Sequence, residues 1–256
     1  SSGRRFEGSR LVRGEDDVLN EFDENAVEAA AQLVAAYGGE VLAVSMGPED
    51  TSDALIRCLA LGADSAYLLS DPLLENADVT VTARALAALI ALLAEEEAID
   101  LVLCGMAASD AMTSMLPAAL AAVMNVPLVS QVRELTVDPA NGYVQALRSV
   151  DGVDETLRAS LPAVVSVTDQ LNEPRFPGFK DLKAARMKPL VQAELDDVAG
   201  YDPSGCLSEL VSGAHSEMPL SVVSMTEHNR DGSGEVFTDT GDGGTRLAEF
   251  IEEKMK

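Results

Sequence analysis

The stretch EVLAVSMGPEDTSDALIRCLALGADSAYLLSD, residues 40–71, decides the fold class. It starts with a short apolar run at Val41–Val44, which a Gly47-Pro48 turn ends. A helical segment follows and stops at Gly62, and a second apolar run, AYLLSD, completes the unit. Two short buried strands joined by a helix are typical of a βαβ unit with parallel strands. The stretch therefore predicts an open parallel sheet.

The same alternation continues on both sides of this unit. Upstream, residues 14–39 predict an amphipathic helix with Asp23 or Asn25 as its N-cap, and two glycines end it. Downstream, residues 78–98 predict a long helix, and IDLVLCG predicts a third buried strand. We therefore expect an α/β fold built on an open, mostly parallel, Rossmann-like sheet.

Residues 126–170 have a different pattern, in which apolar and polar side chains alternate. Asn141-Gly142 lies between the first two runs of this pattern, and this dipeptide is the strongest short-range signal for a hairpin. The run Val164–Val167 indicates a buried central strand. We expect antiparallel strands to be added to the parallel sheet.

Composition limits the classes of function. The chain has 256 residues and a formal net charge of -25, which argues against nucleic acid and against an anionic membrane surface as partners. No apolar run is long enough to span a membrane, so we expect no direct membrane insertion, and no secretory signal is visible. Three widely spaced cysteines show no disulfide or zinc pattern, which fits a reducing, cytoplasmic location.

Three loops are expected at the carboxyl ends of the strands, where ligands bind in open α/β sheets. They are Asn20–Asn25, Ser45–Asp50 and Gly105–Pro117. In the third loop Ser109, Asp110, Thr113 and Ser114 precede a helix, PAALAAVMN, whose free N–H groups favour an anion. A phosphate is the anion that we expect to bind there. The alternative is that these residues only cap the helix.

The sequence contains no recognisable catalytic set. Its two histidines, His215 and His228, lie in an irregular tail, and no HExxH, GxSxG, Walker-type or GxGxxG motif occurs. The chain is therefore predicted to be a binding protein and not an enzyme. Two parts are expected: an α/β domain at residues 1–189, and a C-terminal extended arm at residues 190–256. The arm ends in a helix at Thr245–Lys254 and needs another surface to pack on.

The segment Leu171–Pro189, LNEPRFPGFKDLKAARMKP, is basic in an otherwise acidic chain. Prolines stiffen its first half, and Phe176 and Phe179 stand among them. A rigid, cationic segment with aromatic side chains is typical of a docking surface. The alternative is a surface loop whose aromatic side chains fold back into the core.

Several stretches resemble one family over nearly the whole chain. DENAVEAAAQLVAAYGGEVLAVSMGP, ALIRCLALGAD, DLVLCG and above all LPAVVSVTDQLNEPRFPGFKDLKAARMK are similar to the β subunit of electron transfer flavoproteins, in its actinobacterial branch. The resemblance implies an electron-carrier subunit that pairs with an α subunit bearing the redox-active FAD. It also implies an AMP in the β subunit, acyl-CoA-type dehydrogenases as electron donors and a membrane quinone oxidoreductase as acceptor. A nucleotide-free scaffold, or an electron-bifurcating subunit with FAD in the β site, are the alternatives.

The resemblance also carries residue roles. It implies a docking segment in which Phe179 anchors the dehydrogenase, with Arg175, Phe176 and Lys180 beside it. The nucleotide-contacting positions that it implies are Asn20, Glu21, Phe22, Asp23, Met46, Ala107, Ala108, Ser109, Asp110, Ala111, Met112, Thr113, Ser114, Met115, Leu116, Pro117 and Ala118.

The sequence departs from the family pattern in three places. The family's opening strand, of the type KIVVxVKQVPD, has no counterpart in this sequence. A parallel sheet without that strand would expose strand edges, so we expect that this sequence does not include the opening segment. Ala111 and Ser114 stand where relatives often have glycine, which allows close backbone approach. Lys183 stands where methionine is common, and Met187 interrupts the usual run of lysines.

Overall fold

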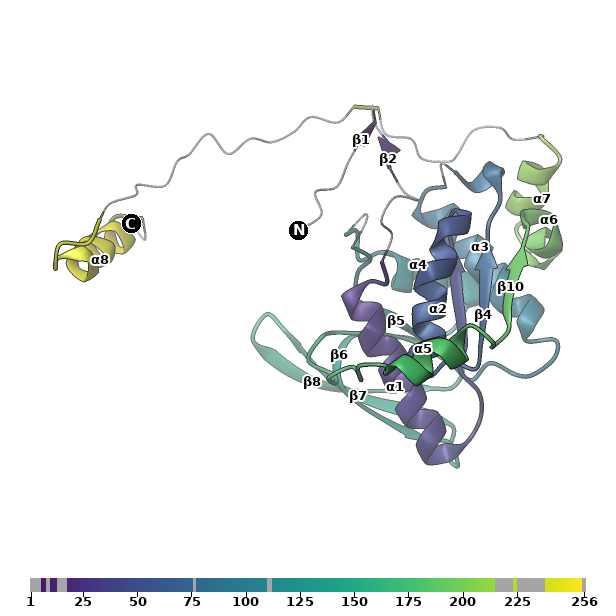
Figure 1. The fold of residues 1–256 in the computed structure, drawn as a ribbon, viewed down its shortest axis with the longest axis horizontal. Helices are drawn as coiled ribbons and strands as arrows, with labels where there is room; N and C mark the ends of the chain where they lie inside the picture. The colour runs from purple at the N-terminus through teal and green to yellow at the C-terminus, as the bar shows by residue number, and fades with distance from the viewer. Residues whose placement is uncertain are drawn as a thin grey trace. The chain divides into compact units, whose positions relative to one another are not determined.

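The computed structural model describes residues 6–7, 10–12, 18–75, 77–109, 112–214, 223–224 and 238–254. The chain divides into two compact units, Ser1–Val223 and Ser224–Lys256. Within the described residues, the first unit holds every strand and all helices except the last one. Figure 1 shows the first unit, with labels on most of its helices and strands.

The predicted βαβ unit is present. Strands β3 (Leu42–Met46) and β4 (Ser65–Leu69) are parallel neighbours, and helix α2 (Ser52–Leu61) connects them. A strand that the sequence did not predict, β10 (Leu190–Ala193), pairs in parallel with the other edge of β4. Residues 190–193 therefore belong to the sheet of the first unit, in the order β10-β4-β3.

The remaining strands of the α/β unit form a second, mixed sheet in the order β5-β9-β6-β7-β8. Its strands are β5 (Leu101–Gly105), β6 (Leu128–Asp138), β7 (Tyr143–Val150), β8 (Val153–Ser160) and β9 (Ala163–Val167). The first three strands of that order are parallel, and β6, β7 and β8 form an antiparallel meander. The central strand β9 is buried at all five positions, as the apolar run predicted.

The fold class is confirmed, with strands β3 to β10 divided between two hydrogen-bonded sheets. In the part of the chain that the structure describes, β3 pairs only with β4, and β5 pairs only with β9. Each of these two strands therefore has one edge without a strand partner there. The loops that follow β3 and β5 are two of the three predicted binding loops.

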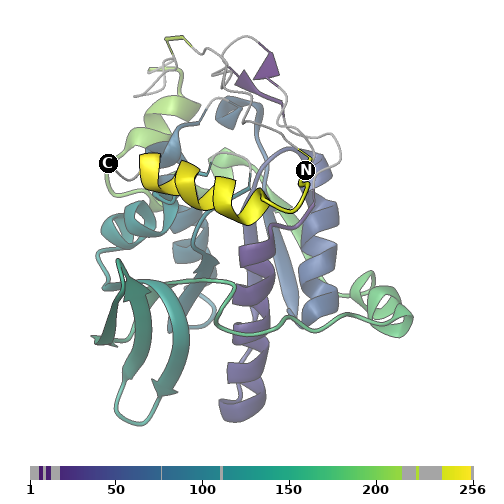
Figure 2. The same cartoon turned by 90° about the vertical axis from the view of Figure 1, so that its left-hand side faces the viewer.

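The helices cover both faces of the sheets. They are α1 (Glu21–Tyr37), α2, α3 (Val79–Leu93), α4 (Leu116–Met124), α5 (Phe179–Ala185), α6 (Leu195–Val198) and α7 (Cys206–Val211). Helices α1, α2 and α5 pack on one face of the parallel sheet, and α3, α6 and α7 pack on the other. Helix α1 also reaches the mixed sheet, and α3 and α4 cover that sheet's opposite face. Figure 2 shows α1 running alongside α2.

Helix ends follow local signals in most cases. Gly62 ends α2 with a φ of 136°, a conformation that favours glycine. Asp78 caps α3 by accepting from the N–H groups of Thr80 at 2.7 Å and Val81 at 3.0 Å. The predicted N-cap of α1 was wrong, because the helix starts at Glu21 and Asn20 occupies that position.

Outside these layers, the described residues include three 3-10 turns, a short strand pair and a terminal helix. The turns are Glu49–Thr51, Pro72–Leu74 and Ala199–Tyr201, and β1 (Phe6–Glu7) pairs with β2 (Arg10–Leu11). Helix α8 (Gly243–Lys254) lies in the second unit, where the sequence predicted a helix. Its apolar side chains Leu247, Phe250 and Ile251 are about half exposed.

Candidate functional site

Asn20 joins the start of α1 to the loop that follows β5. Its side-chain Nδ2 donates to the carbonyl oxygen of Ala107 at 2.9 Å and to Oδ2 of Asp23 at 2.9 Å. Its Oδ1 accepts a hydrogen bond from the Ser109 hydroxyl. Two of the three predicted loops are thus fastened together through one amide side chain.

Asp23 makes a second connection between the same two loops. Its Oδ1 accepts from the N–H of Gly105 at 2.6 Å, at the carboxyl end of β5. A Cβ added to Gly105 would lie 2.6 Å from the Cβ of Phe22 and 2.9 Å from its carbonyl carbon. Only glycine lets the first turn of α1 approach the strand end this closely. The side chain predicted to cap α1 therefore holds β5 instead.

The loop between β5 and α4 has a constrained backbone. Met112 and Ser114 have φ values of 51° and 53°, in the left-handed region that L-residues rarely adopt. Ser114 is a position where the sequence pattern suggested that relatives carry glycine, and the conformation explains that preference. Asp110 and Ala111 lie outside the described residues.

The predicted site residues differ in exposure. Ala107 and Pro117 are buried, and Phe22, Asp23, Met46 and Leu116 are half-buried. The exposed members are Glu21, Ala108, Ser109, Met112, Thr113, Ser114, Met115 and Ala118. Met46 and Leu116 pack against one apolar cluster beneath α3 and α4, which places the end of β3 near the start of α4. All three predicted loops therefore contribute to one end of the sheets.

The predicted docking segment, Leu171–Pro189, is fastened to the second turn of α1. Glu28 accepts hydrogen bonds from the backbone N–H of Arg175 at 3.2 Å, from its Nε at 2.6 Å and from its Nη2 at 3.1 Å. Asn25 and Asn172 exchange bonds, because each Nδ2 donates to the other residue's carbonyl oxygen, at 2.8 and 3.0 Å. Sequence reasoning missed Asn25, Glu28 and Asn172, since nothing local to α1 marks them as partners of a segment 147 residues away.

The aromatic side chains of this segment do not fold back into the core. Phe176 is 90% exposed and Phe179 is 84% exposed, and Lys180 is exposed as well. Arg175, the fourth predicted docking residue, is also exposed, with 49% of its side chain accessible, and its guanidinium pairs with Glu28. Of the two interpretations that the sequence left open, the structure supports an exposed surface.

Comparison with known proteins now gives this arrangement a family. The model of the electron transfer flavoprotein domain matches residues 10–198. The β subunit of an electron transfer flavoprotein from Mycobacterium leprae is 33% identical over 242 residues, which cover 92% of this chain and 86% of the relative. The chain belongs to the electron transfer flavoprotein β-subunit family.

Two further relatives extend the comparison beyond mycobacteria. A β subunit of this family from Thermoanaerobacterium thermosaccharolyticum is 32% identical, over 89% of this chain and 83% of the relative. The caffeyl-CoA reductase-Etf complex subunit CarD of Acetobacterium woodii is 31% identical, over 91% of this chain and 84% of the relative.

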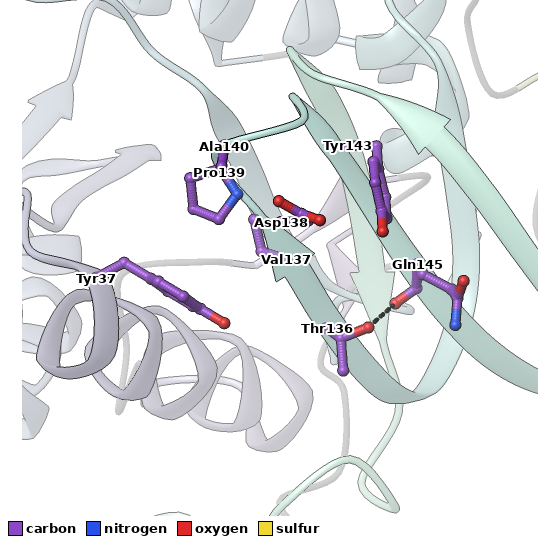
Figure 3. Close-up of a pocket in the computed structure, with 8 residues that line it drawn as sticks. All are labelled: Tyr37, Thr136, Val137, Asp138, Pro139, Ala140, Tyr143 and Gln145. Atoms are coloured by element: carbon purple, nitrogen blue, oxygen red, sulfur yellow. Dashed lines mark hydrogen bonds between the residues drawn. The ribbon is translucent and has the colours of Figure 1, made fainter.

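This electron transfer flavoprotein β subunit has a further hollow away from the binding loops. A cleft of about 550 Å³ lies between the last residue of α1, Tyr37, and the β6–β7 hairpin. Figure 3 shows the Tyr37 ring pointing towards Thr136 and Val137. Two polar side chains of the cleft already have partners: Thr136 Oγ1 donates to the carbonyl oxygen of Gln145, and the Asp138 carboxylate accepts from Asn141 outside the cleft lining. None of the predicted site residues lines this cleft.

The thiols of Cys58 and Cys104 are poor nucleophiles at neutral pH, because their pKa values are raised. Burial, and then the nearby Asp23 carboxylate, raise the pKa of Cys58 and that of Cys104 to about 12. Among the described residues, no group of three or more His, Cys, Asp or Glu side chains is placed to hold a metal ion. Over the same residues, none of the helices has the length and apolar character needed to cross a membrane.

Proposed function

We propose that this chain is the β half of an αβ electron transfer flavoprotein and carries no catalytic group of its own. In this proposal the α partner binds the redox-active FAD, and the pair carries electrons from acyl-CoA-type dehydrogenases towards a quinone oxidoreductase. The observation that carries the proposal is the exposed aromatic pair on the fastened docking segment, Phe176 and Phe179. Large apolar side chains held in the open by a rigid base are typical of partner-binding hot spots.

The surroundings of this pair support a protein partner. Leu182 and Met187 are 39% and 85% exposed, and they extend the apolar surface along and beyond α5. Lys180 and other basic side chains lie in the same segment, which suits an acidic rim on a dehydrogenase. The Acetobacterium relative is named as part of a complex with a CoA-thioester reductase. That name supports an enzyme of CoA thioesters as the partner class here.

The loop before α4 and the start of α1 support a bound AMP phosphate in this proposal. Thr113 and Ser114 present hydroxyl groups in the exposed loop before α4, and the first N–H groups of that helix favour an anion. Ser114 holds the left-handed conformation that glycine would take, so the loop follows its path without one. In this proposal Thr113, Ser114 and the start of α4 hold the phosphate, and Asn20 and Asp23 keep the loop in place. A bound nucleotide would then stabilise the fold and take no part in redox chemistry.

The C-terminal arm completes the proposal. Helix α8 presents Leu247, Phe250 and Ile251 on its surface, each 46% to 56% exposed. These side chains recur at helical spacing and form an apolar stripe. We expect the stripe to be covered by the α subunit.

Nucleotide analysis of the assembled complex tests this function. The chain is co-expressed with an α-type partner, the complex is purified and denatured, and the released nucleotides are separated by chromatography. One FAD and one AMP per heterodimer support the proposal. One FAD without AMP indicates a nucleotide-free scaffold, and two FAD indicate an electron-bifurcating subunit. Failure to co-purify with any α-type partner would overturn all three.

A further inference from the structure

Helix α1 contacts both candidate sites through consecutive turns. Its first turn holds the loop after β5 through Asn20 and Asp23. Its next turn holds the docking segment through Asn25 and Glu28. Residues three apart on a helix share a face, so Asn25 and Glu28 meet the extended stretch Asn172–Arg175 together.

Glu28 is the strongest point of this contact. Its side chain is only 6% exposed, and it accepts three hydrogen bonds from Arg175 and one from Gln32 at 2.7 Å. Burial alone would raise the pKa of Glu28, but the bonds from Arg175 and Gln32 outweigh it and lower the pKa. Glu28 is therefore an anion at neutral pH and needs Arg175 as its counter-charge.

One of these bonds acts on the backbone and not on the guanidinium. The N–H of Arg175 donates to Glu28, which fixes the chain directly before Phe176 and the buried Pro177. The direction in which the docking segment leaves the fold is therefore set at Arg175. Without the carboxylate, the backbone N–H and the half-exposed guanidinium of Arg175 would have to find other partners.

Phe176 also contacts an arginine of α2 that a side chain of α1 holds in place. Its ring centroid lies 5.4 Å from the guanidinium carbon of Arg57, within the range of a cation–π interaction. Arg57, on α2, is oriented by Glu24 of α1, which accepts from its Nε at 3.0 Å. The ring is 90% exposed and yet has a defined neighbour on one side.

We propose that Glu28 is the positioning residue of the docking surface: acting through Arg175, it holds the segment that carries Phe176 and Phe179 in the conformation that the dehydrogenase binds. This inference rests on the proposed function. Ordering a binding segment before the encounter removes part of the entropic cost of association. Glu28 should therefore affect how tightly the dehydrogenase docks and should leave the flavin and its reduction unchanged.

The test uses the assembled heterodimer with the Glu28→Gln variant, which keeps the shape of the side chain and removes its charge. Steady-state reduction by an acyl-CoA dehydrogenase is measured with the heterodimer as the varied substrate. We expect its KM to rise about tenfold, with kcat and FAD content unchanged, which is the pattern of a lost binding contribution. Glu155→Gln is the matched control, because Glu155 also pairs with an arginine, Arg148, at 2.7 Å, but on the β7–β8 hairpin. Its KM should equal that of the unaltered complex.

A second measurement tests whether Glu28 holds the segment, independently of whether a dehydrogenase binds it. Hydrogen exchange of residues 171–188 should be faster in Glu28→Gln than in the unaltered complex, and Arg175→Lys should give the same change. Unchanged exchange overturns the positioning role, as does a lower Tm with an unchanged KM. Loss of FAD or of the α subunit also overturns it, because Glu28 would then serve assembly. If the unaltered complex accepts electrons from no dehydrogenase, the proposed function fails, and the exchange result alone still decides whether Glu28 holds the segment.

Discussion

Gly105→Ala tests the close contact between β5 and the first turn of α1. The new Cβ would lie 2.6 Å from the Cβ of Phe22, 2.9 Å from its carbonyl carbon and 3.0 Å from the backbone nitrogen of Asp23. Two of these three atoms belong to the backbone, so no change of rotamer relieves the clash. Carbon atoms pack at about 3.5–4.0 Å, so the start of α1 has to move by roughly 1 Å.

The cost follows from what that movement disturbs. Overpacking costs about 1–3 kcal/mol. Losing the bond from the Gly105 N–H to the Asp23 carboxylate, now 2.6 Å, would cost about 1.5–3 kcal/mol. The helix either stays in place under strain or moves and breaks the bond, so we expect a loss of about 2–4 kcal/mol in the free energy of unfolding. For a chain of this size that corresponds to a fall in Tm of roughly 6–12 °C.

Thermal unfolding followed by circular dichroism measures the effect, with Gly200→Ala as the control. A Cβ at Gly200 meets no atom within 4 Å, so that variant should stay within about 0.5 kcal/mol of the unaltered protein. The AMP content of the heterodimer should fall in Gly105→Ala only. If both variants melt within about 2 °C of each other, less than one kcal/mol apart, the contact does not constrain α1 and the reasoning is wrong.

Three further outcomes are expected. Phe179→Ala should raise the KM for the dehydrogenase by about 30-fold, which is the effect of losing a hot-spot residue, and should leave the FAD content unchanged. Tyr37→Ala, at the far end of α1, is the control and should leave the KM unchanged. Equal kinetics for the two variants would refute the anchor role. Asp202→Asn should lose about 2–4 kcal/mol in urea unfolding at pH 7, because the buried carboxylate accepts several hydrogen bonds. Burial would raise the pKa of Asp202, but those bonds outweigh it and lower the pKa. The stabilisation is therefore present above the unfolded pKa of about 3.9 and is lost as the pH falls through the folded pKa. If the stability of the variant depended on acid pH in the same way as that of the parent, this explanation would be wrong. Cys58 and Cys104, with pKa values of about 12, should resist iodoacetamide at pH 8 until the protein is denatured, and mass spectrometry of a labelled native protein would show otherwise.

Elements with local signals were predictable from the sequence. Helix α2 ends at Gly62 as expected, and the apolar run of β9 is buried throughout. Strand β10 was missed because LVQA is a four-residue run with two exposed members, and nothing in it separates a strand from a loop. Its strand conformation comes from pairing with β4, a neighbour about 125 residues away in the sequence. The conformation of such a segment is decided by tertiary contacts and not by its own residues.

The candidate site shows the same limit in its polar groups. Asp23 and Asn25 are both good N-cap residues by type, and the sequence offered no reason to prefer Asn20. The structure commits Asp23 to Gly105 and Asn25 to Asn172, 82 and 147 residues away. A cap that bonds only its own helix can be predicted from spacing. A side chain that bonds a distant loop cannot, because the partner is set by how the sheets bring the two together.

Ser114 shows what a departure from a family pattern does to such a site. Without a structure, a serine in place of a glycine suggests that the backbone is barred from its usual path and that the nucleotide is lost. Yet Ser114 has a φ of 53°, so the loop takes the left-handed conformation with serine in it. The strain of an L-residue there is roughly 1–2 kcal/mol, which the contacts of the surrounding loop have to offset. The bond from Asn20 to Ala107 fixes the loop at its other end. The loss of the glycine is therefore weak evidence against a nucleotide, and the nucleotide analysis of the heterodimer decides the question on other grounds.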